Sequence, residues 1–311
     1  MQKAVEKIIN DIKKLKIQGA RNVAKSALTA LALQISASRA DGLNELYNEI
    51  LGVAEKLANS RPTEPMMRNN IEDITRFALM QIKMKNVRTV GAVKKLLVER
   101  EETLLKKMDE DIAKIAEYGA KIIPENAVVI THCHSSSVTR IFKKAKEMGK
   151  NFEVIACETR PLYQGRITAR ELIEAKIKTT LIVDGAVNVF MKKADMCIVG
   201  ADAITSRGDL INKVGTSTVA HIARMHDVSF YSAAELFKYS PLTAYGQRER
   251  IEQRAIAEIW DKPPKSLTIA NPAFDATAAH YITGYITEVG IISAQSLFAI
   301  ATQKLGIKIY E

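Results

Sequence analysis

The sequence predicts an α/β protein with a helical N-terminal domain, residues 1–119, and a Rossmann-like doubly wound parallel-sheet domain, residues 120–311. Two observations carry this prediction. Apolar residues recur at helical spacing before Gly119, and short apolar runs alternate with helical segments after it. The length of 311 residues and the 47% hydrophobic content give ample core for two globular domains.

In the first half, helical spacing is clear around residues 5–12, 23–31 and 43–54. The stretch "RPTEP" at 61–65 interrupts it, because Pro62 and Pro65 disfavour a helix there. A long amphipathic helix is predicted from Val90 to Tyr118, with Gly119 as its end.

In the second half, short apolar runs predict buried parallel strands, and helical segments fall between them. Such alternation is typical of a doubly wound sheet, whose ligands bind beyond the carboxyl ends of the strands. The predicted strands are 127–131, 152–156, 179–183, 196–200 and 228–233, with 266–270 and 281–287 as weaker candidates.

Composition excludes several classes of protein. The formal net charge is +10, but basic residues are spread along amphipathic segments, which favours solvated helix faces and an anionic small molecule over nucleic acid. Aromatic residues make up only 6%, which leaves little for base stacking. No apolar run approaches the ~20 residues of a membrane span, and the start "MQKAVEKIINDIKK" lacks a signal-peptide core, so we expect a cytoplasmic protein without a membrane partner. The three cysteines are too few and too scattered for a disulfide framework.

The predicted strand ends carry polar residues. They supply "HCHSSS" (132–137), "CETRP" (157–161), "DGA" (184–186), "GADAIT" (200–205) and "AAELFK" (233–238). A helix that opens at 135–137 offers N–H groups and hydroxyls, which suit a phosphate, although Ser135 can equally be an ordinary N-cap. The sequence has neither GxGxxG nor GxxxxGK[ST], so we expect no nucleotide cofactor.

The pair of histidines around Cys133 raises the question of a metal. On a strand, side chains alternate, so His132 and His134 would face away from Cys133, and no CxxC or HxxxH motif adds further ligands. We therefore expect no metal. A hydrolase-type cysteine nucleophile is also disfavoured, since no oxyanion or triad pattern accompanies it.

Cys133 and Asp202 suit proton transfer better. Beside a helix N-terminus the pKa of the Cys133 thiol can fall, and apolar neighbours can raise that of Asp202, which gives one base and one acid. An inert buried cysteine and a solvated loop aspartate are the alternatives. Asn212, Lys213 and Lys238 stand at further helix starts or strand ends and fit a doubly phosphorylated ligand, if they are not simply surface residues.

Six motifs in order, "HCHSSS", "ETRPLYQGR", "VGADAI", "INKVGTSTVA", "AAELFKYSP" and "NPAFDAT", resemble the archaeal ribose 1,5-bisphosphate isomerases. These belong to the superfamily of methylthioribose-1-phosphate isomerase and the regulatory subunits of translation initiation factor 2B. The resemblance covers most of 120–311 and continues more thinly through "IQGAR" (17–21) and "RPT" (61–63).

This resemblance implies conversion of ribose 1,5-bisphosphate to ribulose 1,5-bisphosphate through a cis-enediolate, in archaeal AMP salvage and without a cofactor. It implies Cys133 as base, Asp202 as acid, and a homo-hexamer built as a trimer of dimers. The implied phosphate and sugar contacts are Gly19, Ala20, Arg21, Arg61, Ser135, Ser136, Ser137, Asn212, Lys213 and Lys238.

The sequence departs from the family in its first loop, where the usual Arg-Gly-Ala is Gln18-Gly19-Ala20, followed by Arg21. A methylthioribose-1-phosphate isomerase, which needs an apolar pocket for the thioether, is one alternative. A non-enzymatic regulatory protein is the other, and the presence of the Cys133 and Asp202 pair argues against it.

Overall fold

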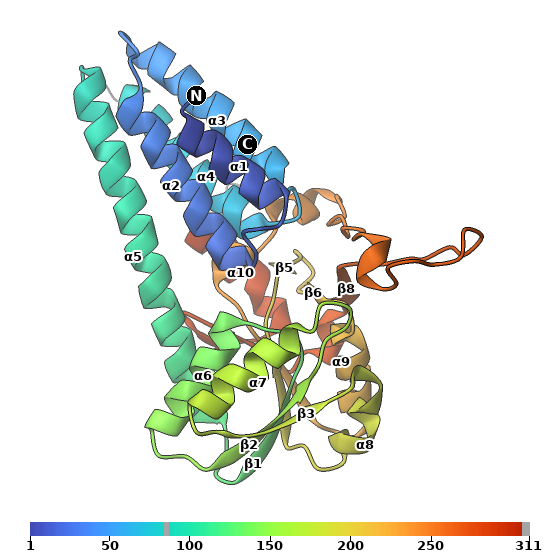
Figure 1. The fold of residues 1–311 in the computed structure, drawn as a ribbon. Coiled ribbons are helices and arrows are strands. Elements are labelled where there is room, and N and C mark those ends of the chain that lie inside the picture. Colours follow the sequence, from blue (N-terminus) through green and yellow to red (C-terminus); the bar gives the residue numbers. More distant parts are fainter. Residues whose placement is uncertain (84–86, 307–311) are drawn as a thin grey trace. The chain divides into compact units, whose positions relative to one another are not determined.

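The computed structural model describes residues 1–83 and 87–306, and the chain divides into two compact units, Met1–Glu110 and Asp111–Glu311. The division falls within the long helix α5, Val90–Ile122 (Figure 1). The boundary predicted at 119/120 lies further along the same helix.

The first unit is helical. It contains α1 (Lys3–Lys13), α2 (Ala20–Ala37), α3 (Leu43–Ser60), α4 (Pro65–Lys83) and the first part of α5. Helix α2 packs against α1, α3 and α4, and its buried side chains Val23, Ala27 and Leu31 recur at helical spacing as predicted. Helix α3 ends at Ser60 and α4 begins at Pro65, so the predicted interruption at 61–65 is present. Within 1–83 and 87–306, no helix combines the length and the apolar character needed to cross a bilayer.

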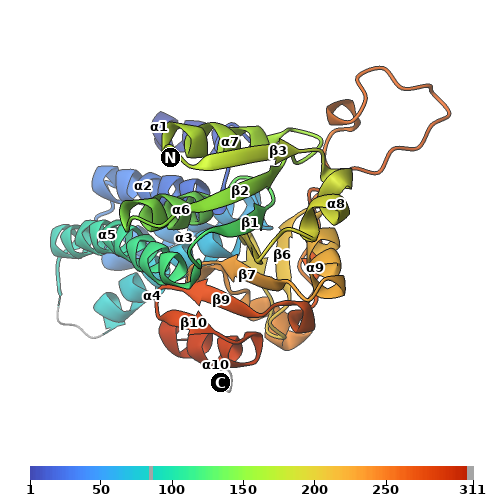
Figure 2. The ribbon, with the colours of Figure 1, turned by 90° about the horizontal axis from the view of Figure 1, so that it is seen from below.

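The second unit is built on a seven-stranded sheet in the order β10-β9-β7-β4-β1-β2-β3 (Figure 2). Its pairs are parallel, except that β10 runs antiparallel to β9. The strands are β1 (Ala127–Thr131), β2 (Phe152–Cys157), β3 (Lys178–Ile182), β4 (Met196–Val199), β7 (Ser229–Ala233), β9 (Gly284–Thr287) and β10 (Gly290–Ile292). The predicted fold class is therefore confirmed.

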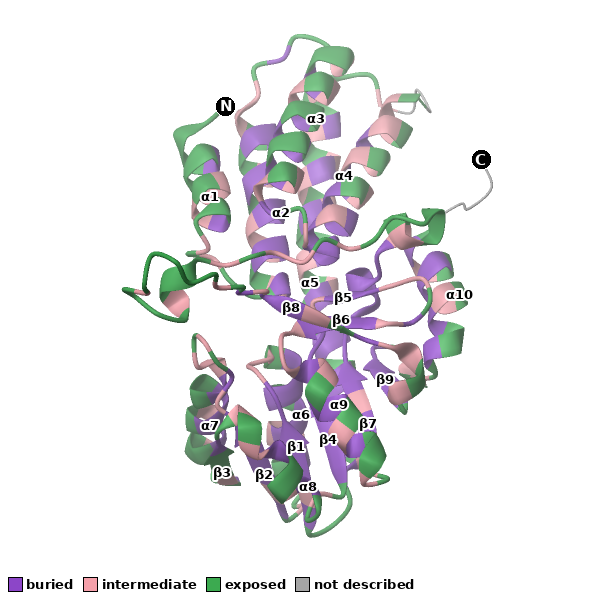
Figure 3. Ribbon diagram, turned by 90° about the vertical axis from the view of Figure 1, so that its right-hand side faces the viewer, coloured by how far each residue is buried: buried purple, intermediate pink, exposed green. Residues whose placement is uncertain are grey.

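Helices cover both faces of this sheet, as the direction of the crossovers requires. Helices α6 (Ser136–Glu147) and α7 (Gln164–Glu174) connect strands in the direction from β1 to β3, whereas α8 (Val187–Met191) and α9 (Thr216–Met225) connect strands in the opposite direction. Val129, Val154 and Ile198 pack with α6, α7 and the end of α5 in one core. The central strands are buried along their length (Figure 3), and α10 (Ala294–Leu305) closes the described chain.

A small antiparallel sheet, β5-β6-β8, stands apart from the large one. It consists of β5 (Ala203–Ile204), β6 (Leu210–Lys213) and β8 (Phe274–Thr277). None of these short strands was predicted from the sequence. They matter for the site, because Asp202 precedes β5 and Lys213 ends β6.

Three predictions about elements are wrong. Helix α5 does not end at Gly119 but continues to Ile122; a Cβ at Gly119 would lie 2.5 Å from Ile141 Cδ1, so this glycine allows α6 to approach closely. Residues 266–270 form no strand and are mostly exposed, since nothing pairs with them in the described chain. Of residues 281–287, only Gly284–Thr287 is a strand.

Candidate active site

The candidate site lies where the sheet changes direction. Strand β1 has β2 on one side and β4 on the other, and the connections that leave β1 and β4 run in opposite directions along the sheet. In such sheets ligands bind beyond the carboxyl ends of the strands at this switch point, a region that we call the crevice. Cys133 follows β1 and Asp202 follows β4, so both stand at this crevice.

The surroundings of the Cys133 thiol determine its pKa. Burial has the largest effect and raises the pKa of Cys133 to about 12. The Lys213 ammonium opposes this shift, and the Asp202 carboxylate adds to it. The expectation of a lowered pKa is therefore wrong, because desolvation of the thiolate outweighs Lys213 and the N–H of His134.

The backbone around Cys133 is not that of a strand. Strand β1 ends at Thr131, and Cys133 has a left-handed conformation with φ of 68°. The argument that His132 and His134 alternate with Cys133 along a strand is therefore wrong in its premise. His132 Nε2 lies 2.9 Å from the Val214 carbonyl, and His134 Nδ1 lies 3.2 Å from the Thr168 hydroxyl.

Asp202 is partly exposed and stands at the entry to the small sheet. Its main-chain N–H donates to the Ile211 carbonyl at 2.9 Å, which fixes its backbone against β6. The neighbours Ala201 and Ala203 are buried. The assignment of Asp202 as the acid stays a prediction.

The predicted phosphate seat coincides with the start of α6. Ser135 is the N-cap residue, but its side chain does not cap the helix, while Ser136 is exposed and Ser137 is buried. A Cβ at Gly200 would lie 2.7 Å from Ser135 Oγ, so the glycine after β4 lets the two loops meet. The start of a twelve-residue helix beside the crevice suits an anion.

The three polar residues predicted around the small sheet and β7 have different surroundings. Asn212 is buried and donates from its amide to Thr216 Oγ1 at 2.9 Å. Lys213 Nζ lies 5.2 Å from the centre of the Phe274 ring. Lys238 is buried, and its Nζ lies 3.4 Å from a carboxylate oxygen of the buried Glu235.

The remaining predicted contacts belong to the first unit. Gly19 has φ of 83° and precedes α2, whose first residue is Ala20. The Arg21 guanidinium donates to the Met108 carbonyl at 2.7 Å and pairs with Asp109 at 2.5 Å. Arg61 lies 3.3 Å from Glu64. Substrate binding by these four residues stays a prediction.

Sequence reasoning noted the strand ends "CETRP" and "DGA" but gave their residues no role. In the structure, the Thr159 hydroxyl accepts the Cys133 N–H, and Asp184 accepts the Thr159 N–H. Only the positions of Thr159 and Asp184 could have indicated a role from the sequence, since both residues follow strands adjacent to the site.

Three side chains of types that can bind a metal ion lie close together next to Thr159. His132, Cys157 and Asp184 each bring one potential ligand atom within 4.8 Å of the others. Both carboxylate oxygens of Asp184 already accept main-chain N–H groups, from Thr159 at 2.8 Å and Arg160 at 2.7 Å. Asp184 and His132 therefore act here as hydrogen-bonding groups.

A further carboxyl group caps the helix beside Lys213. Asp275 accepts the N–H of Gly215 at 2.7 Å and that of Ser217 at 3.2 Å at the start of α9. Burial raises the pKa of Asp275 to about 6, although these N–H groups oppose the shift.

This pKa predicts a dependence of stability on pH. Between about pH 4 and 6 the Asp275 carboxyl is protonated in the folded chain and ionised in the unfolded chain, so stability falls as pH rises. The shift corresponds to at most about 3 kcal/mol. We expect the free energy of unfolding of the wild type, relative to Asp275→Asn, to fall from pH 4 to 6.5 in urea titrations. A difference that does not change with pH would contradict this.

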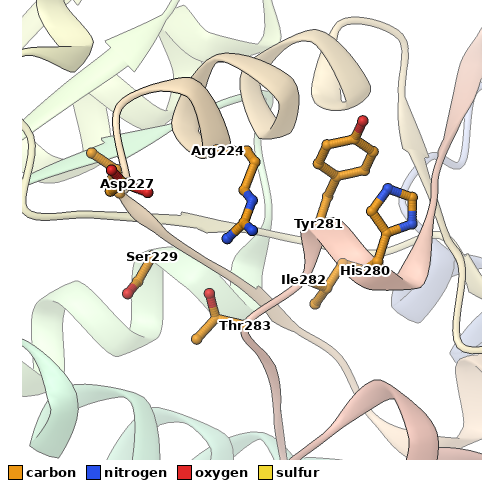
Figure 4. Close-up of a pocket in the computed structure, with 8 residues that line it drawn as sticks. Arg224, Asp227, Ser229, His280, Tyr281, Ile282 and Thr283 are labelled. Carbon is orange, nitrogen blue, oxygen red and sulfur yellow. The ribbon is translucent and has the colours of Figure 1, made fainter.

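A pocket of about 210 Å³ lies at the amino ends of the strands, where β7 begins. Its lining includes Arg224, Ser229, Tyr281 and Thr283 (Figure 4). Ser229 is the first residue of β7, so this pocket faces away from the carboxyl ends of the strands. It is therefore separate from the crevice that holds Cys133.

Comparison with known proteins identifies relatives of the whole chain. A ribose 1,5-bisphosphate isomerase of Thermococcus kodakarensis is 35% identical over 309 residues, which cover 98% of this chain and 95% of that protein. A methylthioribose-1-phosphate isomerase of Citrifermentans bemidjiense is 32% identical over 90% of this chain and 85% of its own length. A crystal structure of the Pyrococcus horikoshii translation initiation factor eIF-2B superposes with a TM-score of 0.80 at 30% identity, covering 94% of this chain and 98% of that one. The model of the Initiation factor 2 subunit family matches residues 16–294, and the chain belongs to this family.

Proposed function

We propose that the chain is an isomerase that converts ribose 1,5-bisphosphate to ribulose 1,5-bisphosphate. The support comes from archaeal relatives of that name, about 35% identical over nearly the whole chain. The structural observation that carries the proposal is that Cys133 and Asp202 follow the adjacent parallel strands β1 and β4, and that Lys213 and Asp202 both act on the pKa of the Cys133 thiol. A base, an acid and a cation at one crevice suit proton transfer on an anionic sugar.

The reaction needs two coordinated proton movements. Asp202 donates a proton to the ring oxygen, which opens the ring, and the Cys133 thiolate removes the proton from C2, which gives an enol whose O1 carries phosphate. The ionised Asp202 then takes the proton of the C2 hydroxyl, which gives the cis-enediolate, and the thiol returns its proton to C1 as the ketone forms. Both residues end in their starting states, and the product is an isomer of the substrate.

Because its pKa is raised, the resting Cys133 thiol is protonated, and its proton must pass to Asp202 before these steps begin. The negative charge of Asp202 raises the pKa of Cys133, so protonation of Asp202 removes one obstacle to the thiolate. Lys213 favours the thiolate in either state. The acid form of Asp202 and the base form of Cys133 therefore support each other.

The two phosphates of the substrate need two binding sites that are positively charged or rich in N–H groups. The start of α6 at Ser135–Ser137 provides one site, and Lys213 with Lys238 provides the other. Gly19, Ala20, Arg21 and Arg61 belong to this proposal as contacts implied by the family resemblance.

Assembly and cellular context are further parts of the proposal. We place the chain in the cytoplasm, in AMP metabolism, as a homo-hexamer built as a trimer of dimers. Support for assembly comes from the loop between Gly246 and Asn271, drawn in orange in Figure 1, which extends away from the second unit. Its apolar side chains Ile256, Ile259 and Trp260 are exposed, as at a surface that contacts another subunit.

Lys238→Ala should raise the Michaelis constant for ribose 1,5-bisphosphate by roughly ten- to a hundredfold. A charge-assisted contact to phosphate contributes about 1.5–3 kcal/mol, and this range corresponds to that change in affinity. Steady-state kinetics measures it. The same variant also removes the ion pair of Glu235, so its melting temperature must be measured in parallel.

Lys150→Ala is the control, because its ammonium donates to the main-chain carbonyls of Ala120 and Ile123, before β2 and thus at the amino ends of the strands. Its Michaelis constant should equal that of the wild type. An unchanged Michaelis constant in Lys238→Ala would place the phosphate elsewhere.

The substrate itself is tested by comparing two sugars. The wild type should show a kcat/KM for ribose 1,5-bisphosphate at least a hundredfold above that for 5-methylthioribose 1-phosphate, since lysines at the second site have no partner in a thioether. Preference for the thioether sugar would reassign the chain to methylthioribose-1-phosphate isomerase. Inactivity toward both would favour the regulatory class.

A further inference from the structure

Two residues beyond neighbouring strands have backbone conformations that are rare for their type. Cys133, after β1, has φ of 68°, and Thr159, after β2, has φ of 64°. A β-branched residue such as threonine is strained in this left-handed region. Strain of this kind persists only where the surroundings hold the backbone in place, and it concentrates at functional sites.

Hydroxyl groups hold both sides of Cys133. Its N–H donates to Thr159 Oγ1 at 2.9 Å, and its carbonyl accepts from Thr168 Oγ1 at 3.0 Å. Thr159 is 0% exposed and Thr168 1% exposed, so water does not compete for these bonds. Both main-chain polar groups of Cys133 are thus bonded to side chains from other elements.

Thr159 is itself fixed at two points. Its hydroxyl donates to the Cys157 carbonyl at 3.1 Å, and its N–H donates to Asp184 Oδ1 at 2.8 Å. The Asp184 carboxylate follows β3, so the bonds form a line from the end of β3 through that of β2 to Cys133. Each residue in this line lies within the second unit.

We propose that Thr159 and Thr168 are positioning residues for the Cys133 thiol. This inference rests on the proposed function, in which Cys133 takes the C2 proton. Because the left-handed backbone sets the direction of the Cys133 Cβ, releasing it would move the thiol away from the reacting atom. A displacement of about 1 Å can cost on the order of a hundredfold in rate without loss of substrate binding.

Thr159→Val keeps the shape of the side chain and removes its hydroxyl. We expect kcat to fall by roughly ten- to a hundredfold, while the Michaelis constant stays within about twofold of the wild type. Thr159→Ser keeps the hydroxyl and should recover most of the lost kcat. A simple packing role predicts the reverse order, because valine fills the space better than serine.

Thr302→Val is the matched control for a buried threonine whose hydroxyl donates to main-chain carbonyls, here those of Phe298 and Ala299 in α10. It should affect stability alone. If Thr159→Val does not fold, Thr168→Val tests the same claim from the carbonyl side of Cys133, with the same split between kcat and the Michaelis constant.

A second readout needs no substrate. The rate of alkylation by iodoacetamide, followed by mass spectrometry on the peptide that contains Cys133, reports how firmly the thiol is held. We expect Thr159→Val to raise this rate at least severalfold, and Thr302→Val to leave it unchanged. The alkylation experiment tests the positioning of Cys133 separately from the proposed function, because its result does not depend on whether ribose 1,5-bisphosphate is the substrate.

The positioning role is overturned if Thr159→Val or Thr168→Val folds, keeps kcat within twofold of the wild type, and is alkylated at Cys133 at the wild-type rate. It is also overturned if Thr159→Ser loses as much activity as Thr159→Val. A wild type that does not turn over ribose 1,5-bisphosphate, together with faster alkylation of Thr159→Val, sinks the proposed function and leaves the positioning of Cys133 intact.

Discussion

Replacing Cys133 by serine is expected to reduce turnover of ribose 1,5-bisphosphate by at least about a hundredfold, the lower end of the usual contribution of general acid–base catalysis. The serine hydroxyl is close in size to the thiol but is a far weaker acid, so it gives almost no alkoxide to take the C2 proton. The fold should persist, because the bonds to Thr159 and Thr168 use the main chain of Cys133. Substrate affinity, measured by calorimetry on the inactive variant, should be near that of the wild type.

Cys197→Ala provides the control for loss of a thiol. Cys197 is 0% exposed, and its sulfur lies 3.8 Å from that of Met191, away from the crevice. This variant, and likewise Cys157→Ala, should remain active. A Cys133→Ser variant that retains a tenth of the wild-type rate would rule out the role of the thiolate.

The raised pKa of Cys133 predicts how the rate depends on pH. With the thiol pKa at about 12, only a small fraction of the thiol is ionised at neutral pH. The reactive pair, a Cys133 thiolate with a protonated Asp202, carries as many protons as the resting pair, a Cys133 thiol with an ionised Asp202, so its population does not change with pH over this range. The kcat/KM of the wild type should therefore stay level from pH 7 to 9. A tenfold rise for each pH unit would contradict Asp202 as the acid.

Asp202→Asn carries the second large effect. The asparagine keeps the shape and the hydrogen-bonding reach of the side chain but has no acidic proton for the ring oxygen. Because a 1-phosphorylated ribose has a blocked anomeric oxygen, its ring does not open by the ordinary route of a free sugar. Turnover should fall by at least about a hundredfold, with normal folding and near-normal binding.

Asp202→Asn should lower turnover but make the Cys133 thiol more reactive. Removing the carboxylate removes a charge that raises the pKa of the thiol. Alkylation of Cys133 should therefore become faster in Asp202→Asn even as turnover is lost. Asp209→Asn, in the turn before β6, is the control, since Asp209 caps the N–H of Ala279 and should affect neither rate.

If Asp202→Asn turns over ribose 1,5-bisphosphate as fast as the wild type, Asp202 is not the acid. The assignment would then move toward the non-enzymatic regulatory class. Slower alkylation with lost turnover would indicate instead that the substitution distorts the loop before β5.

The large sheet could be predicted because its strands are short, buried apolar runs with helical segments between them. Strands β1 and β2 fall where the runs at 127–131 and 152–156 place them. The short strands β5 and β8 could not, because they pair in a small sheet whose partners are remote in sequence. The continuation of α5 through Gly119 could not be predicted from the sequence either, since it depends on the contact with Ile141.

The site shows the same division between position and environment. Cys133 and Asp202 were predictable as strand-end residues of a parallel sheet, whose switch point the topology sets. The direction of the Cys133 pKa shift was not, because it depends on how far burial outweighs Lys213. Thr159 and Thr168 were also out of reach, since their roles arise from a left-handed backbone that sequence spacing does not reveal.

The most direct test is to incubate the purified chain with ribose 1,5-bisphosphate as the sole substrate and follow the phosphorus NMR spectrum, with Cys133→Ser in a parallel sample. The account predicts that the wild type forms ribulose 1,5-bisphosphate and that the spectrum of the Cys133→Ser sample does not change on the same timescale. A wild-type sample that leaves the substrate unchanged, or a Cys133→Ser sample that forms product at the wild-type rate, would contradict it.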